Sequence, residues 1–297
     1  MFYLFLVSLI WGFSFVIIKG SLASLDSSFV SYARLLLSLL VFIPFVRPAR
    51  IGFQAKLQLM LIGGVQFGLM YLAYIAAFRD LPAHVIALLT TTTPIFVSIF
   101  AGLYAKSARK AVFLGALLAV AGGAVLQFPD QPLAANIRGI FLVQVSNAAF
   151  AFGQIAYRKW MISKPTLQDE SIFAFLYAGA VVVTGIFSLF TTSYERLSVQ
   201  PQQWLALVYL GIIASGLSFF LWNMGSRKVN EGILAVMNNA KIPVAIIASL
   251  TILGERTGWP RLLAGGILFA AALCVNARSA PVTRTIPIIG KDAHPKV

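Results

Sequence analysis

Charged residues are scarce in this chain, and acidic residues are the scarcest of them. Of the 297 residues, 11% are charged and 59% are hydrophobic, and 9 Asp and Glu stand against 23 Lys and Arg. Soluble domains carry about a quarter charged residues. A water-soluble fold of this length could not bury so much apolar surface, whereas a fold surrounded by lipid does not have to. The composition therefore excludes a soluble protein and predicts an all-α integral membrane protein.

Cysteine and histidine are almost absent. The single Cys274 rules out a disulfide within the chain, and the two histidines, His84 and His294, are far apart in the sequence. The sequence has no metal-ligand spacing, no nucleophile with a matching base and no glycine-rich phosphate loop. We therefore expect no metal site, no cofactor and no enzymatic activity.

The formal net charge of +14 would suit a nucleic-acid-binding protein, but the positions of the basic residues argue against that function. These residues lie mostly in short polar gaps between apolar runs, as topology determinants of membrane proteins do. The gaps on one side, such as 106–110 and 158–164, hold most of them. The positive-inside rule places that side in the cytoplasm. We predict no nucleic-acid partner and both termini in the cytoplasm.

Apolar runs long enough to cross a bilayer follow one another along the whole chain. A spanning helix needs about 20 mostly apolar residues. The first run has no basic region ahead of it and no cleavage site near its end, so we expect a retained helix and not a signal peptide. The sequence predicts ten spans, at about 2–20, 28–46, 57–78, 84–105, 111–128, 138–157, 171–191, 204–225, 232–253 and 260–277.

The two halves of the chain resemble each other at an offset of 148 residues. Gly63 then matches Gly211, and Arg79 matches Arg227, so that the third and fourth spans map onto the eighth and ninth. Because a repeat of five spans is odd, the second copy enters the membrane from the opposite side, as in many secondary transporters. We predict these segments: a first repeat at 1–128, a second repeat at 129–278, and a disordered cytoplasmic tail at 279–297.

Lys241 is the most informative residue because it lies near the middle of the ninth span, where no carboxylate accompanies it. Every Asp and Glu falls in a gap or at a helix end. An ammonium at that depth is costly unless it faces a polar interior. One interpretation is that Lys241 binds an anionic group of a substrate, such as a carboxylate. The other is that it is structural and bonds helix carbonyls or a Tyr hydroxyl.

Polar residues precede a proline in both halves. Asn238 comes three residues before Lys241 and shares its helix face, and Pro243 follows. At the 148 offset the equivalent positions are Thr90 and Thr93, followed by Pro94. We expect Asn238 and the two threonines to hydrogen-bond a substrate, although threonines can also bond their own backbone. We expect the two prolines to act as hinges, each freeing a carbonyl and kinking its helix.

Aromatic and amide side chains complete the candidate site. Tyr71 and Tyr74 share a face of the third span, and Trp222 is the counterpart of Tyr74 in the eighth. These rings could line a pocket or be ordinary packing. Asn147 and Gln154, seven residues apart in the sixth span, are candidate polar groups of the same cavity.

Several stretches resemble the EamA-type transporters of the drug/metabolite transporter superfamily. Residues 11–19 (WGFSFVIIK) resemble the first-helix pattern of that family, and Arg34, Pro94 and residues 254–256 (GER) also fit it. The chain departs at 105–107, where AKS replaces the Gly-Glu expected after the fourth helix. The resemblance implies ten helices in two inverted halves. It also implies a bacterial inner-membrane carrier, often an exporter of amino acids or related metabolites, that works by alternating access around a central cavity.

We therefore predict a secondary transporter, an exporter or exchanger, for a small anionic or zwitterionic metabolite such as an amino acid or organic acid. Its expected partners are the lipid bilayer and the small-molecule substrate. One alternative is a carrier of neutral or aromatic solutes in which Lys241 is structural. A channel and a membrane scaffold or receptor without transport activity are further alternatives, and the repeat argues against the last of these.

Overall fold

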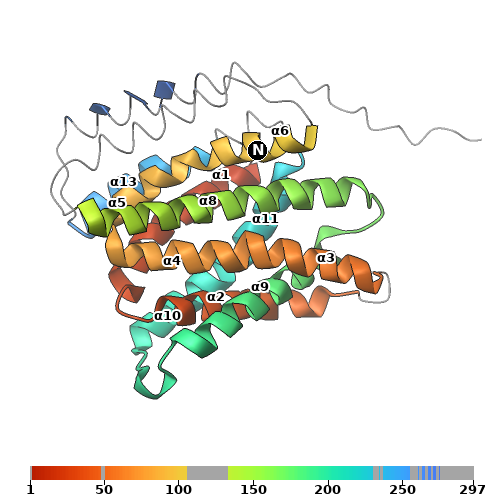
Figure 1. The fold of residues 1–297 in the computed structure, drawn as a ribbon, viewed down its shortest axis with the longest axis horizontal. Helices are drawn as coiled ribbons and strands as arrows, with labels where there is room; N and C mark the ends of the chain where they lie inside the picture. The colour runs from red at the N-terminus through yellow and green to blue at the C-terminus, as the bar shows by residue number, and fades with distance from the viewer. Residues whose placement is uncertain are drawn as a thin grey trace, which may run out of the picture.

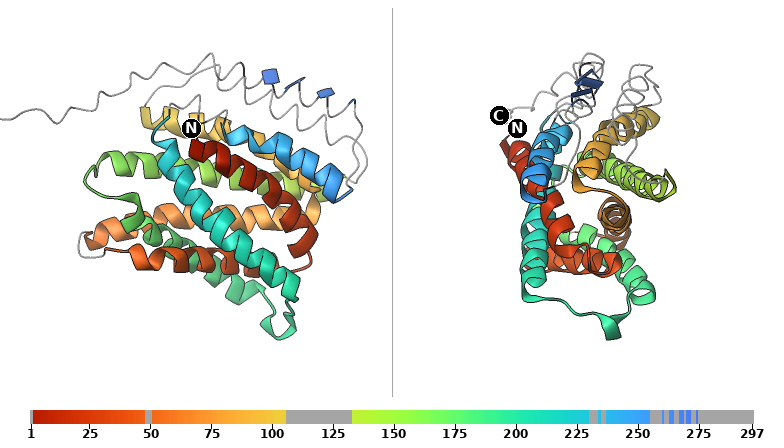
Figure 2. Two further views of the ribbon diagram at one scale, coloured as in Figure 1. Left: turned by 180° about the vertical axis from the view of Figure 1, so that it is seen from behind. Right: turned by 90° about the vertical axis from the view of Figure 1, so that its left-hand side faces the viewer.

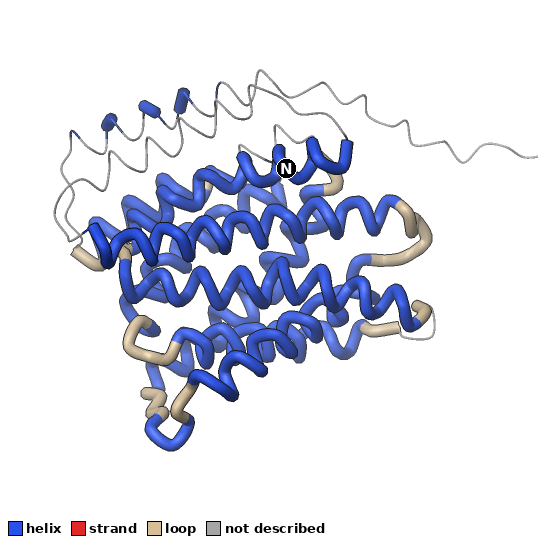
Figure 3. The backbone as a smooth tube through the Cα atoms, in the orientation of Figure 1, coloured by secondary structure: helices blue, strands red, loops and turns tan. Residues whose placement is uncertain are grey.

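The protein is a bundle of long helices in the computed structural model, which describes residues 2–47, 51–105, 133–229, 234 and 237–254, with isolated positions between 260 and 274. Within these residues the regular structure is helical, with no strand (Figure 3). The helices lie side by side along one direction, and their connections gather at the two opposite ends (Figures 1 and 3). This arrangement suits a bilayer, in which a helix satisfies all its own backbone groups.

Three of the apolar runs in the described part of the chain contain a junction between two α-helical segments. The described helices are α1 (Phe2–Ile17), α2 (Ser27–Phe42), α3 (Phe53–Gly63), α4 (Met70–Asp80), α5 (Ala83–Leu89), α6 (Thr93–Ala105), α8 (Leu133–Ile162), α9 (Asp169–Thr191), α10 (Pro201–Tyr209), α11 (Ser218–Ser226) and α13 (Lys241–Ile252). π-Helical turns join α3 to α4 at Gly64–Leu69 and α10 to α11 at Leu210–Leu217, and a 3-10 turn at Thr90–Thr92 joins α5 to α6.

Seven helices in the described part of the chain are long and apolar enough to cross a membrane. They are Phe2–Leu22, Ser27–Phe45, Phe53–Asp80, Ala83–Tyr104, Ile137–Ile162, Asp169–Thr191 and Pro201–Ser226. Each coincides with a predicted span, and the predicted ninth span corresponds to a shorter apolar helix, Met237–Ile252. The predicted fifth span and tail lie outside the described residues, as does most of the tenth span.

Two helices lie in matching positions on the two sides of the bundle. Helix α8 lies between α6 and α4 (Figure 1), and α1 lies between α13 and α11 (Figure 2). Helix α9 packs along both α2 and α3. At the α3–α9 contact a Cβ on Gly63 would meet the backbone of Leu176, and one on Gly179 would meet the backbone of Met60. Small residues at such points let helix backbones approach closely, which is how helices associate within lipid.

Candidate substrate-binding site

A cavity lies where helices from both halves of the chain meet. Its volume is about 60 Å³, and the space around it, out to its open side, is about 520 Å³. Its wall is contributed by α1, α2, α4, the α5–α6 junction, α8, α11 and α13. The lining residues are Trp11, Ser14, Phe15, Ile18, Arg34, Met70, Tyr71, Tyr74, Thr90, Thr93, Ser146, Asn147, Phe150, Phe219 and Lys241.

Lys241 reaches the cavity from the first position of α13. Its side chain is buried, and its Nζ lies 5.2 Å from the centroid of the Trp11 ring, a cation–π contact. The indole is itself fixed, because Nε1 of Trp11 donates a hydrogen bond of 2.8 Å to the Ala214 carbonyl. Among the described residues Lys241 has no carboxylate partner. The ring offsets part of the cost of burying the ammonium, but it leaves the charge directed at the cavity.

Arg34 supplies a second buried cation on the same wall. One of its terminal nitrogens donates to the Tyr71 hydroxyl at 2.8 Å and to Ser215 Oγ at 3.1 Å. The guanidinium carbon lies 4.4 Å from the centroid of the Tyr71 ring. Nε and the other terminal nitrogen have no partner within the described chain. Arg34 is not among the binding residues that the sequence predicts, although an arginine inside a span without a carboxylate is a usable signal.

The run of threonines at the α5–α6 junction, residues 90–93, which we call the threonine-rich turn, borders the cavity. Thr90 and Thr93 line it, and their hydroxyls donate to the carbonyls of Ala87 and Thr90 at 2.7 and 2.6 Å. Both protons are therefore used locally, but each hydroxyl oxygen can still accept a hydrogen bond. Asn147 on α8 also lines the cavity, and its Nδ2 donates to the Leu89 carbonyl at 2.9 Å. This bond ties α8 to the threonine-rich turn.

Aromatic rings close the cavity on two sides. Tyr71 and Tyr74 line it from α4, and Phe15 meets Tyr74 edge-on at 5.8 Å between centroids. On the other side four rings pack against one another, with centroids between 4.8 and 6.5 Å apart. We call these rings the aromatic partition: Trp11, Phe150, Phe219 and Trp222.

Three of the predicted binding residues lie off the cavity wall. Trp222 is fully buried behind Trp11 in the aromatic partition, and its Nε1 donates to Gln154 Oε1 at 3.2 Å. Asn238 is buried, and neither its Oδ1 nor its Nδ2 has a partner in the described chain. The structure thus brings Lys241, Tyr71, Tyr74, Thr90, Thr93 and Asn147 together and leaves Trp222, Gln154 and Asn238 beyond them.

Each proline follows a local change of helix geometry inside its span, and the hinge role stays a prediction. Pro94 is the second residue of α6 and Pro243 the third of α13, so each lies in the first turn of a helical segment that begins after a break. Proline costs no hydrogen bond in a first turn, because the first four N–H groups of a helix have no partner within it. Pro94 is buried, whereas Pro243 is exposed on the outside of the bundle.

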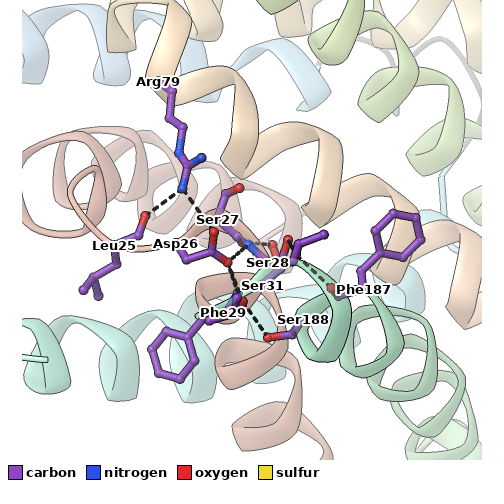
Figure 4. A network of polar contacts seen from close by, with 11 residues as sticks. Leu25, Asp26, Ser27, Ser28, Phe29, Ser31, Arg79, Phe187 and Ser188 are labelled. Atoms are coloured by element: carbon purple, nitrogen blue, oxygen red, sulfur yellow. Dashed lines mark hydrogen bonds and ion pairs between the residues drawn. The ribbon is translucent and has the colours of Figure 1, made fainter. Parts of the chain in front are cut away.

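An ionic network lies at one end of the bundle. Asp26 caps α2 by accepting hydrogen bonds from the N–H groups of Ser28 and Phe29. It pairs with Arg79 at 3.3 Å, as Figure 4 shows, and accepts a bond of 2.6 Å from Thr192 Oγ1. Burial alone would raise the pKa of the Asp26 carboxyl. The hydrogen bonds and the Arg79 charge outweigh burial, and the pKa is lowered below its ordinary value.

A second ionic network lies at the opposite end. Asp169, the first residue of α9, pairs with Arg227 and accepts a hydrogen bond from the Tyr157 hydroxyl. The two networks lie at opposite ends of α9. Asp169 is its first residue, whereas Thr192, which bonds Asp26, directly follows its last. The helix has 23 residues and is therefore about 34 Å long. In the described part of the chain, none of the acidic residues lines the cavity.

Comparison with known proteins identifies the class of this molecule. The pattern of the EamA-like transporter family matches residues 1–127 and 137–277. The "Biotin transporter" of Escherichia coli is 32% identical over 277 residues, covering 93% of this chain and 92% of that protein. The "Probable biotin transporter" of Pseudomonas aeruginosa is 34% identical over 276 residues, covering 92% and 96%.

Weaker likenesses agree with these matches. The "Uncharacterized inner membrane transporter YedA" of Escherichia coli is 23% identical and covers 92% of this chain and 89% of its own. A solved crystal structure with 17% identity matches with a TM-score of 0.69 over 94% of this chain and 97% of its own, which is a likeness in fold. The prediction of a membrane transporter that is not an enzyme is confirmed, whereas amino acid transport is not supported. The chain belongs to the EamA-like transporter family.

Proposed function

We propose that this transporter carries biotin, or a solute with the same combination of groups, through the cavity between its two halves. Biotin has a carboxylate on an aliphatic chain and a neutral cyclic urea at the other end. The observation that supports an anionic solute most directly is the pair of cations on the cavity wall, Lys241 and Arg34, with no described carboxylate beside them. The names of the relatives favour biotin over an amino acid.

In this proposal Lys241 binds the carboxylate by a charge-assisted hydrogen bond, and Arg34 adds a second positive charge. The aliphatic chain then lies against Phe15, Tyr74 and the aromatic partition, where its apolar surface is removed from water. The cavity volume of about 60 Å³ is well below the several hundred Å³ of ordinary ligand pockets. The wall must therefore open for the solute, which suits a carrier that changes shape in each cycle.

Alternating access between two inverted halves accounts for the internal symmetry. The π-helical turns at Gly64–Leu69 and Leu210–Leu217 correspond at the 148 offset. The environment of α8, between α6 and α4, corresponds to that of α1, between α13 and α11. The family pattern matches one range in each half of the chain. These observations support a site at the interface of two repeats, as in other secondary transporters.

The two ionic networks suit the role of gates at opposite ends. Arg79 and Arg227 correspond at the 148 offset. Each arginine pairs with an aspartate at the start of the preceding spanning helix in its half of the chain. Asp26 caps α2, and Asp169 begins α9. We expect one pair to separate when the cavity opens on its side while the other stays closed. In this reading the protein lies in a bacterial inner membrane with both termini in the cytoplasm, and Asp169–Arg227 closes the cytoplasmic side.

Counterflow of labelled biotin in proteoliposomes tests the proposed function. We expect saturable exchange by the wild type and a rate at least about 10-fold lower for Lys241→Met, because a hydrogen bond to a charged group contributes about 1.5–3 kcal/mol. Lys56→Met is the matched control, since Lys56 also lies over a ring, 5.8 Å from the centroid of Phe175, but outside the cavity. No biotin exchange by the wild type would contradict the proposal. Full exchange by folded Lys241→Met would mean that Lys241 is structural and does not bind the carboxylate.

A further inference from the structure

Three buried amide side chains lie beyond the aromatic partition, and two of them are hydrogen-bonded to each other. Nε2 of Gln66 donates to Oδ1 of Asn223 at 3.1 Å, and Gln154 accepts from Trp222, the neighbour of Asn223. A Cβ on Gly153, next to Gln154, would meet the side chain of Gln66. Helices α8 and α11 and the π-helical turn before α4 thus contribute one buried amide each to the region behind the aromatic partition, with Gln66 bonded to Asn223 and Gln154 bonded to Trp222. We call Gln66, Gln154 and Asn223 the amide cluster.

Each member of the amide cluster keeps an unused hydrogen-bonding atom. All three side chains are 0–1% exposed, and Gln66 Oε1, Gln154 Nε2 and Asn223 Nδ2 have no partner in the described chain. Exchanging the O and N positions of both bonded amides, Gln66 and Asn223, would still leave one donor and one acceptor unused. Buried polar groups are normally satisfied, so such a concentration of unused atoms needs an explanation.

The amide cluster lies on the side of the cavity that faces the Asp169–Arg227 pair. Asn223 follows the cavity residue Phe219 by four residues toward Arg227, about 6 Å along α11. Gln154 follows the cavity residue Asn147 by seven residues, about 10 Å along α8 in the direction of Tyr157.

The position of Gln66 in the π-helical turn before α4 agrees with this placement. Gln66 precedes Tyr71 by five residues, which displaces it away from the Arg79 end of the bundle. A solute that leaves the cavity toward Asp169 and Arg227 therefore meets the amide cluster after the aromatic partition.

We propose that the amide cluster is a second binding site on the transport path, and that it takes a neutral group carrying both a carbonyl and an N–H, such as a cyclic urea. The unused amide nitrogens donate to the carbonyl of that group, and the unused amide oxygen accepts from its N–H. This inference rests on the proposed function, because the ureido ring of biotin is such a group. The carboxylate would remain near Lys241 and Arg34 while the ring passes the partition.

The test uses Gln66→Leu/Asn223→Leu in proteoliposomes loaded for biotin counterflow. Replacing both partners of a buried hydrogen bond by apolar groups of similar shape is nearly neutral for stability, so we expect the melting temperature to be retained. We expect the biotin rate to fall at least about 10-fold. Thr184→Val is the control, because Thr184 is buried in α9, bonds only its own helix and lies outside the cavity.

Two competitors separate the amide cluster from the cationic site. Excess 2-imidazolidinone, a cyclic urea without a carboxylate, should inhibit biotin exchange by the wild type but not the residual exchange by the double variant. Octanoate, a carboxylate without an N–H, should inhibit both. An unchanged biotin rate in the double variant overturns the inference. So does 2-imidazolidinone that inhibits the double variant, or that does not inhibit the wild type. Each of these results would mean that the amide cluster does not bind the cyclic urea.

Failure of the proposed function has a different signature, since the wild type would then exchange no biotin. If the double variant does not fold, Gln154→Leu removes the amide contributed by α8 and carries the same expectations, including the loss of inhibition by 2-imidazolidinone.

Discussion

At the scale of single residues, the position of a buried charge was more predictable than its surroundings. Lys241 could be singled out because it lies deep in an apolar run of a chain whose carboxylates are all predicted in gaps or at helix ends. Arg34 had the same property, but only the fold shows that its face of α2 turns toward Tyr71 and Ser215. Trp222 lies behind Trp11 and not on the cavity wall. Sequence periodicity shows which face of a helix a residue is on, but not which of two stacked rings lies nearer the cavity.

Arg34→Lys tests whether the geometry of the guanidinium matters in addition to its charge. A lysine keeps the charge but cannot hold the Tyr71 hydroxyl and Ser215 while stacking on the Tyr71 ring. Losing a hydrogen bond to a charged group costs about 1.5–3 kcal/mol. We expect the KM for biotin in counterflow to rise at least about 10-fold. The control is Arg138→Lys at the exposed end of α8. An unchanged KM in both variants would mean that Arg34 contributes only its charge.

At the scale of elements, the apolar runs gave the spans closely, and the breaks within them were not predicted. The span expected at 57–78 is the helix Phe53–Asp80, but it contains a π-helical turn that no propensity rule indicates. The prolines marked a break, yet its form, a helical segment starting just before each proline, depends on tertiary contacts. Ser8 Oγ donates to the Met237 carbonyl at 2.9 Å and so satisfies a backbone group near the start of α13.

Gly179→Ala tests the close approach of α3 and α9. The added Cβ would meet the backbone of Met60, which cannot move aside as a flexible side chain can. We expect a loss of about 1–3 kcal/mol, the usual cost of overpacking, measured as a lower melting temperature in detergent. Gly64→Ala is the matched control, because its nearest neighbour at 3.2 Å is a methyl group of Val183. Equal melting temperatures for Gly179→Ala and the wild type would mean that the helices pack less tightly than described.

At the scale of the whole molecule, one cavity collects residues from both halves of the chain, as the proposed repeat would require. The offset of 148 residues paired Arg79 with Arg227, and the fold places both in ion pairs at opposite ends of the bundle. The offset could not indicate their partners, because Asp26 and Asp169 belong to other helices. The sequence carries no signal for the solute beyond a negative charge, and the expectation of an amino acid comes only from the family resemblance and not from the residues.

Equilibrium binding of biotin and of biotinamide to the purified protein tests the central claim most directly, because the two ligands differ only in the carboxylate. The account predicts that the wild type binds biotin at least about 10-fold more tightly, corresponding to about 1.4 kcal/mol. It also predicts that Lys241→Met loses most of this preference, because Arg34 alone then faces the carboxylate. Equal affinities in the wild type, or an undiminished preference for biotin in folded Lys241→Met, would contradict a carboxylate site at Lys241.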